Sequence, residues 1–213
     1  MLKLYHCPNA RSMRSLWLLY ELNIEFELVE MPFDQKFTRS PEYLSVHPLE
    51  RVPCLVHNDL TLYESGAICQ YLCEIFDKDD QLGRSIKHKE HAEWIQWLHY
   101  AETIAVHGAS LVQQNIIIAE ELRSPVVIKL ESRRLEKTLE VLDNHLNGRD
   151  YLLKSGFSAV DTSVGYSIHM GSMFVKISAF KNVENYYNKL KRRDAFKKSL
   201  PKDVNDPLKT IEV

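Results

Sequence analysis

The feature that most constrains the fold of this chain is a change of pattern near residue 78. Residues 1–78 alternate short apolar runs with amphipathic stretches, in the predicted order strand, helix, strand, helix, strand, strand, helix. After the polar run 79–86, which contains Gly83, only helical spacing continues. The sequence therefore predicts an α/β domain over 1–78, a linker over 79–86 and an all-helical domain over 87–213.

The predicted elements of the first domain follow from the period of the apolar residues. Period-two patterns indicate strands, and spacings of three and four indicate helices. Asn58 and Asp59 tolerate the positive φ of a tight turn, so they predict a hairpin between the last two strands. The expected strands are 2–5, 26–30, 54–57 and 60–63, and the expected helices are 14–22, 41–46 and 65–76.

Two long amphipathic segments dominate the second domain. Residues 91–112 and 126–146 each place apolar side chains on one broad face. Pro125 stands where the first turn of a helix accepts a proline. A helical bundle is the expected arrangement.

Composition limits the partners. The 27 Lys+Arg against 29 Asp+Glu give a formal net charge of −2, so nothing points to nucleic acid. No apolar run approaches the roughly 20 residues of a membrane span, and the first residues lack the pattern of a secretory signal. We therefore expect a cytoplasmic protein without membrane attachment. The four cysteines lack CxxC spacing, which favours small buried side chains and predicts no metal site.

Two motifs in the first domain resemble those of the cytosolic glutathione S-transferases. His47-Pro48-Leu49-Glu50-Arg51-Val52-Pro53 resembles the N-P-x-x-x-V-P stretch of that family. Tyr63-Glu64-Ser65-Gly66-Ala67-Ile68 resembles its [E/Q]-S-x-A-I segment. With the order of the elements, the resemblance covers nearly the whole chain and implies a thioredoxin-like first domain.

The resemblance also implies a site for glutathione as co-substrate. In the family the second proline of the first motif is cis, and the residue before it pairs with the cysteinyl backbone of the tripeptide. The positions implied here are Arg51, Val52 and Pro53. Ser65 and the free amides of its helix can hold the γ-glutamyl carboxylate, while Glu64 can accept from the ammonium group.

A third motif resembles the capping box of the family's second domain. In Phe157-Ser158-Ala159-Val160-Asp161, Ser158 can accept from the amide of Asp161, and the Asp161 side chain can accept from the amide of Ser158. Thr162 stands where an aliphatic residue usually completes the hydrophobic staple, so we expect a weaker apolar contact there. This motif predicts a structural role.

A free thiol near pKa 8.5 is mostly protonated at neutral pH, so the protein must stabilise the thiolate. The sequence leaves open which residue does this. Ser12 is the leading candidate, since serine-type members place a hydroxyl just before the first helix. Cys7 is the rival, because Cys7-Pro8-Asn9-Ala10 resembles the Cys-Pro-x-Ala of omega-like members that form a mixed disulfide. Asn9 could donate through its amide, and Tyr5 resembles the phenol of tyrosine-type members.

The resemblance predicts a transferase that uses the glutathione thiolate against small hydrophobic electrophiles, as in detoxification. Tyr100, His107, Tyr166 and Met170 are candidate residues lining the electrophile site. Family members dimerise, so a homodimer is expected. Two alternatives remain: glutathione-dependent thiol transfer or reduction through Cys7, and a non-catalytic binding module of the same fold.

Overall fold

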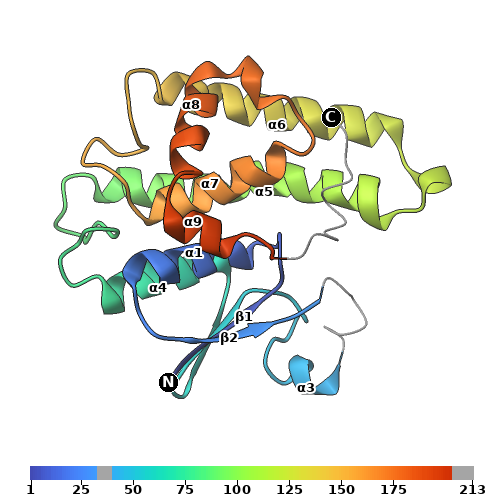
Figure 1. Cartoon of the computed structure of the whole chain (residues 1–213). Helices are drawn as coiled ribbons and strands as arrows, with labels where there is room; N and C mark the ends of the chain where they lie inside the picture. Colours follow the sequence, from blue (N-terminus) through green and yellow to red (C-terminus); the bar gives the residue numbers. More distant parts are fainter. Residues whose placement is uncertain (33–39, 203–213) are drawn as a thin grey trace. The chain divides into compact units, whose positions relative to one another are not determined.

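The structure is a computed structural model that describes residues 1–32 and 40–202. Within it the chain forms two compact units (Figure 1). The first contains Met1–His88 together with Arg193–Pro201, and the second contains Lys89–Arg192.

A four-stranded mixed sheet forms the centre of the first unit. Its strands are β1 (Leu2–His6), β2 (Glu27–Glu30), β3 (Cys54–His57) and β4 (Leu60–Tyr63), in the order β2-β1-β3-β4. β1 is parallel to β2 and antiparallel to β3, which is antiparallel to β4. The predicted thioredoxin-like fold is therefore confirmed.

Two helices pack beside this sheet in Figure 1, α1 (Ser12–Leu22) and α4 (Ser65–Phe76). The short helix α3 (Pro41–Leu44) begins at Ser40, whose hydroxyl accepts from the Tyr43 amide. Helix α1 contributes a continuous buried run, Met13 to Leu19, because its apolar residues occupy more than one face. The core of the unit lies between these helices and the buried side of the sheet.

The last helix, α9 (Asp194–Ser199), belongs to the first unit although it lies near the end of the described chain. The Phe196 ring packs edge-on against Trp17 of α1, with ring centroids 4.9 Å apart. Arg193 donates to both carboxylate oxygens of Glu21, at 2.6 and 2.7 Å. An apolar anchor and a bidentate ion pair thus fix this six-residue helix on α1.

The second unit is built of helices, as predicted. Its long antiparallel pair, α5 (His91–Val112) and α6 (Pro125–His145), is joined by a π-helical turn (Gln113–Ile117) and a 3-10 turn (Glu120–Leu122). Helix α7 (Ala159–Gly171) packs on α5 and is buried along nearly its whole length. A 3-10 turn (Ile177–Ala179) and α8 (Lys181–Leu190) complete the unit.

The start of α7 is organised by the predicted capping box, which the structure confirms. The Asp161 carboxylate is fully buried and accepts four hydrogen bonds: from the Leu152 amide, the Ser158 amide, the Ser158 hydroxyl and the Tyr186 hydroxyl. Burial outweighs these donors and raises the pKa of Asp161 to about 6.

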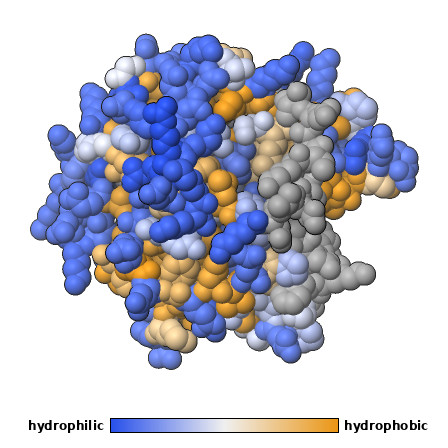
Figure 2. All heavy atoms as spheres, viewed as in Figure 1, coloured by the Kyte–Doolittle hydropathy of each residue, from blue (hydrophilic) through white to orange (hydrophobic). Residues whose placement is uncertain are grey.

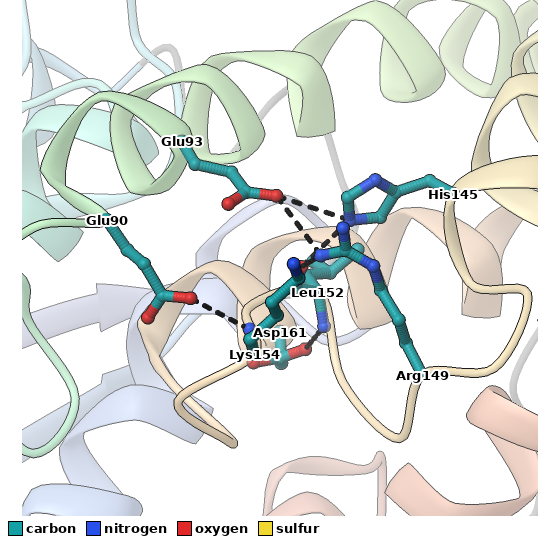
Figure 3. A network of polar contacts seen from close by, with 7 residues as sticks. All are labelled: Glu90, Glu93, His145, Arg149, Leu152, Lys154 and Asp161. Carbon is teal, nitrogen blue, oxygen red and sulfur yellow. Dashed lines mark hydrogen bonds and ion pairs between the residues drawn. The ribbon is translucent and has the colours of Figure 1, made fainter.

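Further ion pairs surround the segment that leads into α7 (Figure 3). Glu93 of α5 lies 3.3 Å from Arg149 and 3.7 Å from His145. Glu90 accepts from the Lys154 amide at 3.0 Å, and His145 lies 2.8 Å from the Leu152 carbonyl. The loop 146–157 is therefore tied to both α5 and α6 by polar contacts.

The face shown in Figure 2 carries mostly hydrophilic residues, with hydrophobic residues visible between them. Among the described residues, no helix combines the length and the apolar composition needed to cross a bilayer.

Candidate functional site

The sequence motifs of the first unit come together at one edge of the sheet, where β1 and β4 end and β3 begins. Tyr5 of β1 stands opposite Cys54 of β3, which stands opposite Tyr63 of β4. Three loops therefore meet at this edge: 7–11 after β1, 47–53 before β3, and the β4–α4 junction at residues 64–65. Chain segments nearly 60 residues apart become neighbours because antiparallel pairing places these strand ends side by side.

The loop 47–53 carries the three residues implied for the tripeptide backbone. The Val52–Pro53 peptide bond is cis, as the resemblance implied. Arg51 is exposed, Val52 is half-buried and Pro53 is buried. The Tyr43 hydroxyl donates to the Arg51 carbonyl at 2.6 Å, so α3 holds the loop next to the cis bond.

At the β4–α4 junction, Glu64 is exposed and Ser65 is buried. Ser65 opens α4, where the amides of a first helical turn favour an anion. The Arg14 guanidinium of α1 donates to the Ser65 hydroxyl at 3.0 Å. Arg14 is 1% exposed, so a buried positive charge lies directly behind Ser65. This edge of the sheet is therefore suited to a carboxylate.

Backbone geometry marks the same three loops. Among the described residues, six non-glycine residues have positive φ, and three of them, Asn9, Glu50 and Glu64, lie in these loops. Asparagine tolerates this region, but glutamate does not do so readily. Glu64 has φ 75° and ψ 110°, outside the small left-handed helical region. Unfavourable backbone conformations of this kind cluster at binding sites.

Ser12, the leading predicted thiol donor, lies at the start of α1 and is fully buried. Its hydroxyl accepts from the Cys7 amide at 3.1 Å and lies 3.2 Å from the Cys7 carbonyl and 2.8 Å from His6 Nδ1. The hydroxyl proton thus has acceptors within the protein. This geometry favours a structural role for Ser12, as the residue that closes loop 7–11.

His6 completes this buried arrangement. Its imidazole is 2% exposed, and burial lowers the pKa of His6 to about 4. The ring is therefore neutral at pH 7. Depending on its tautomer, the neutral ring accepts a hydrogen bond from the Ser12 hydroxyl at Nδ1 or donates one to it from Nδ1.

Cys7, the rival candidate, is 4% exposed, with its thiol 3.7 Å from the Pro8 carbonyl. Burial, assisted by the charge of Glu30, raises the pKa of Cys7 to about 12. The thiolate is therefore scarce at neutral pH, which disfavours Cys7 as a nucleophile. Asn9 is buried in the same loop with φ 59°, and the Tyr5 ring is half-buried against Tyr43, with centroids 5.5 Å apart.

The predicted electrophile-lining residues belong to the second unit. The Tyr100 hydroxyl of α5 donates to the Thr138 carbonyl of α6 at 3.0 Å. His107 Nδ1 lies 2.7 Å from the Glu131 carboxylate, which also accepts from Arg134. Both residues thus help to join α5 to α6. Tyr166 and Met170 of α7 are buried, at 4% and 6% exposure.

Sequence reasoning missed two residues that shape the site. Arg14 interrupts the apolar run of α1, and a charge in a buried helical face was the available signal. The sequence marks His47 only as the first residue of a motif, yet its side chain is 4% exposed and its Nδ1 accepts a hydrogen bond from the Leu49 amide at 3.1 Å. Within residues 1–32 and 40–202, no cluster of three or more His, Cys, Asp or Glu could hold a metal ion.

Comparisons with known proteins point to one family. Residues 1–74 match the family described as "Glutathione S-transferase, N-terminal domain". Glutathione S-transferase F13 of Arabidopsis thaliana is 32% identical over 202 residues, which cover 88% of this chain and 89% of that protein. Glutathione S-transferase F10 of the same plant is 29% identical over 207 residues, covering 92% and 95%.

A solved structure extends the likeness to the fold of both halves. The glutathione transferase homolog from Lodderomyces elongisporus, solved with two GSH per subunit, aligns with a TM-score of 0.85 at 16% identity. The alignment covers 93% of this chain and 96% of that one. At this identity the structural likeness speaks for the fold alone.

Proposed function

The chain belongs to the glutathione S-transferase family, and from this premise we propose that it binds glutathione and transfers it, as the thiolate, to small hydrophobic electrophiles. The observation that carries the proposal is the convergence of Pro53, Ser65 and loop 7–11 at one sheet edge. A tripeptide lying along this edge would meet a backbone segment, an anion site and a helix N-terminus in succession.

The first part of the proposal concerns the γ-glutamyl end. Ser65 accepts from Arg14, so its own hydroxyl proton remains available to donate to a carboxylate. The buried guanidinium and the first turn of α4 add positive potential at the same point. Glu64, which is exposed, accepts from the ligand's ammonium group. Arg51 and Val52 supply the backbone groups that pair with the cysteinyl residue.

The second part concerns the thiol. Donation from the Ser12 hydroxyl to sulfur would break its contacts with Cys7 and His6. We therefore assign the hydrogen bond to sulfur to the Asn9 amide, with help from the N-terminal end of α1. Ser12 instead holds loop 7–11 in place through its hydrogen bonds with the Cys7 backbone. The alternative route through a Cys7 mixed disulfide is disfavoured by the raised pKa of that thiol.

The remaining parts of the proposal rest on the family. Tyr100, His107 and Tyr166 stay candidate residues for the electrophile, and the transferase acts in the cytoplasm as a homodimer in detoxification. The domain boundaries 1–78, 79–86 and 87–213 likewise stay a prediction. No metal takes part in this proposal.

The test combines ligand binding with ultraviolet absorbance of the bound thiolate, followed during pH titration. The wild type is expected to bind reduced glutathione and to lower its thiol pKa below the free value of about 8.5. Asn9→Ala should bind glutathione but lose the thiolate signal. Ser12→Ala should be less stable yet keep the signal, and Cys7→Ser should keep turnover of an activated aryl chloride.

Three other outcomes would favour a different thiol donor or a different function. Loss of the thiolate in Ser12→Ala alone would return that role to Ser12. Loss of turnover in Cys7→Ser, with disulfide exchange in the wild type, would favour thiol transfer. Binding with an unchanged thiol pKa would indicate a non-catalytic module.

A further inference from the structure

His47 lies beneath the exposed tip of loop 47–53. The tip residues Pro48 and Leu49 are exposed, Leu49 by 63%, whereas the His47 side chain is 4% exposed. The imidazole lies between two tyrosines, with its centroid 6.4 Å from that of Tyr43 and 4.9 Å from that of Tyr63. A buried ring thus anchors a solvent-facing loop from within.

Hydrogen bonds tie this ring and its backbone to the rest of the loop. His47 Nδ1 accepts from the Leu49 amide at 3.1 Å, and the His47 carbonyl accepts from the Glu50 amide at 2.9 Å. The first contact joins a side chain to the amide two residues on, as an Asx turn does. It stabilises a turn whose next residue, Glu50, has φ 54°. Loop 47–53 therefore depends on an acceptor at position 47.

This acceptor exists only while the imidazole is neutral. Nδ1 must lack a proton to accept from Leu49, so the neutral ring carries its proton on Nε2. A protonated ring would turn one N–H toward another and lose the bond. The contact is partly buried, with the ring itself only 4% exposed, so water replaces the lost bond less easily than it would at an open surface.

Several charged and titratable groups face the ring. Burial has the largest effect and lowers the pKa of His47; the backbone of His47 itself and the charge of Glu64 raise it, and Arg51 lowers it. Tyr43 of α3 and Tyr63 of β4 contribute aromatic faces. Because the pKa of the folded form lies below the ordinary 6.5, the neutral ring predominates above pH 6.5 and is lost as pH falls through the lowered pKa.

We infer that His47 is a positioning residue for the tripeptide site: its neutral imidazole holds loop 47–53 in the binding conformation, and its protonation releases the loop. The ligand named here rests on the proposed function. The affinity for glutathione is then sensitive to mildly acidic pH through a side chain that does not touch the ligand.

The experiment measures the dissociation constant of S-methylglutathione between pH 7.5 and 5, by calorimetry on the full chain. This ligand has no ionisable thiol, so titration of sulfur does not contribute. In the wild type the affinity should fall by about fivefold or more toward pH 5, because fewer molecules carry the competent loop. His47→Asn keeps a side-chain acceptor and cannot be protonated, so its affinity should be independent of pH across this range.

Two further variants sharpen the comparison. His47→Leu keeps apolar volume without an acceptor, so it should bind weakly at every pH. His57→Asn is the matched control: this histidine belongs to the same sheet, contacts Tyr71 and pairs with Leu2 at the opposite end of β1. It should retain the pH dependence of the wild type. A wild type with constant affinity, or an equal pH dependence in His47→Asn, would overturn the inference.

A ligand-free measurement separates this inference from the proposed function. Amide hydrogen exchange at Leu49, corrected for the intrinsic pH effect, should speed up below pH 6.5 in the wild type and not in His47→Asn. If no glutathione binds at any pH, the proposed function fails, while the exchange data still decide the role of His47. Equal protection of Leu49 in both proteins at pH 5 would remove that role.

Discussion

The loops of the first unit and the capping network of the second unit both bury polar groups, but they do so differently. In the network, donors from the preceding loop, from the start of α7 and from Tyr186 of α8 all converge on one fully buried carboxylate, that of Asp161. In the loops, Glu50 and Glu64 keep positive φ, and Ser65 lies beside an exposed edge. The comparison indicates that the network stabilises the fold, whereas the loops keep unfavourable backbone conformations at the place proposed for the ligand.

The largest expected effect comes from breaking the network. Asp161→Ala leaves four donors around an enclosed space without their acceptor, and we expect it to lower the free energy of unfolding by about 3 kcal/mol. Urea unfolding measures this change. Asp194→Ala is the control, since its side chain is 86% exposed in an ion pair with Lys197 and should change little. A loss below about 1 kcal/mol for Asp161→Ala would contradict this interpretation.

The pH dependence of stability should have opposite signs in the two regions. The pKa of Asp161 is raised from 3.8 to about 6, so the native state binds more protons in that window and stability falls by about 3 kcal/mol as pH rises. The pKa of His6 is lowered from 6.5 to about 4, so the unfolded state binds more protons and stability rises by about 3 kcal/mol.

Single variants separate these opposing effects. Between pH 4 and 6, Asp161→Asn should make stability rise more steeply with pH than in the wild type, and His6→Gln should make it rise less steeply or fall. Unfolding midpoints across that range provide the measurement. Parallel curves for the wild type and both variants would show that neither group titrates as described.

The elements that the sequence predicted correctly are bounded by local signals. Strands 54–57 and 60–63 and helices 65–76 and 91–112 were predicted to the residue, because the Asn58-Asp59 turn and clear periodicity bound them. The capping box was also confirmed, since both of its residues lie three apart in one motif. Local signals of this kind need no knowledge of distant contacts.

The features that escaped prediction depend on distant contacts. The pattern did not indicate that α9 would pack on α1, because the sequence of a six-residue helix does not indicate which element it contacts. The structure shows the contact between the rings of Trp17 and Phe196. Nor did it indicate that the Ser12 hydroxyl would point into the loop it closes rather than outward. The spacing of a hydroxyl before a helix fits a cap, a donor to substrate and an internal support equally well.

A smaller effect tests whether the loop conformation is costly. Glu64→Gly should raise the free energy of unfolding by about 1 kcal/mol, because glycine adopts φ 75° without a Cβ clash. It should also weaken glutathione binding, since the carboxylate is removed. Glu64→Ala is the control: it removes the same carboxylate but keeps the Cβ, so it should weaken binding without the gain in stability. Equal stability of the two variants would argue against strain at this position.

The smallest effect lies on the exposed side of α6. Lys137 and Glu140 form a 2.6 Å ion pair, with side chains 75% and 51% exposed. Lys137→Ala should change the free energy of unfolding by no more than about 0.5 kcal/mol. Thermal unfolding at low and high salt would check this. A loss comparable with that of Asp161→Ala would erase the distinction between the network and ordinary surface pairs.

The central claim is that glutathione lies along the sheet edge formed by Pro53, Ser65 and loop 7–11. The most direct measurement is a titration of isotopically labelled protein with reduced glutathione, followed by backbone amide chemical shifts. The account predicts saturable shifts concentrated at Val52, Ser65 and residues 7–12. Shifts that do not saturate at millimolar ligand, or that saturate at other residues while this edge stays unchanged, would contradict it.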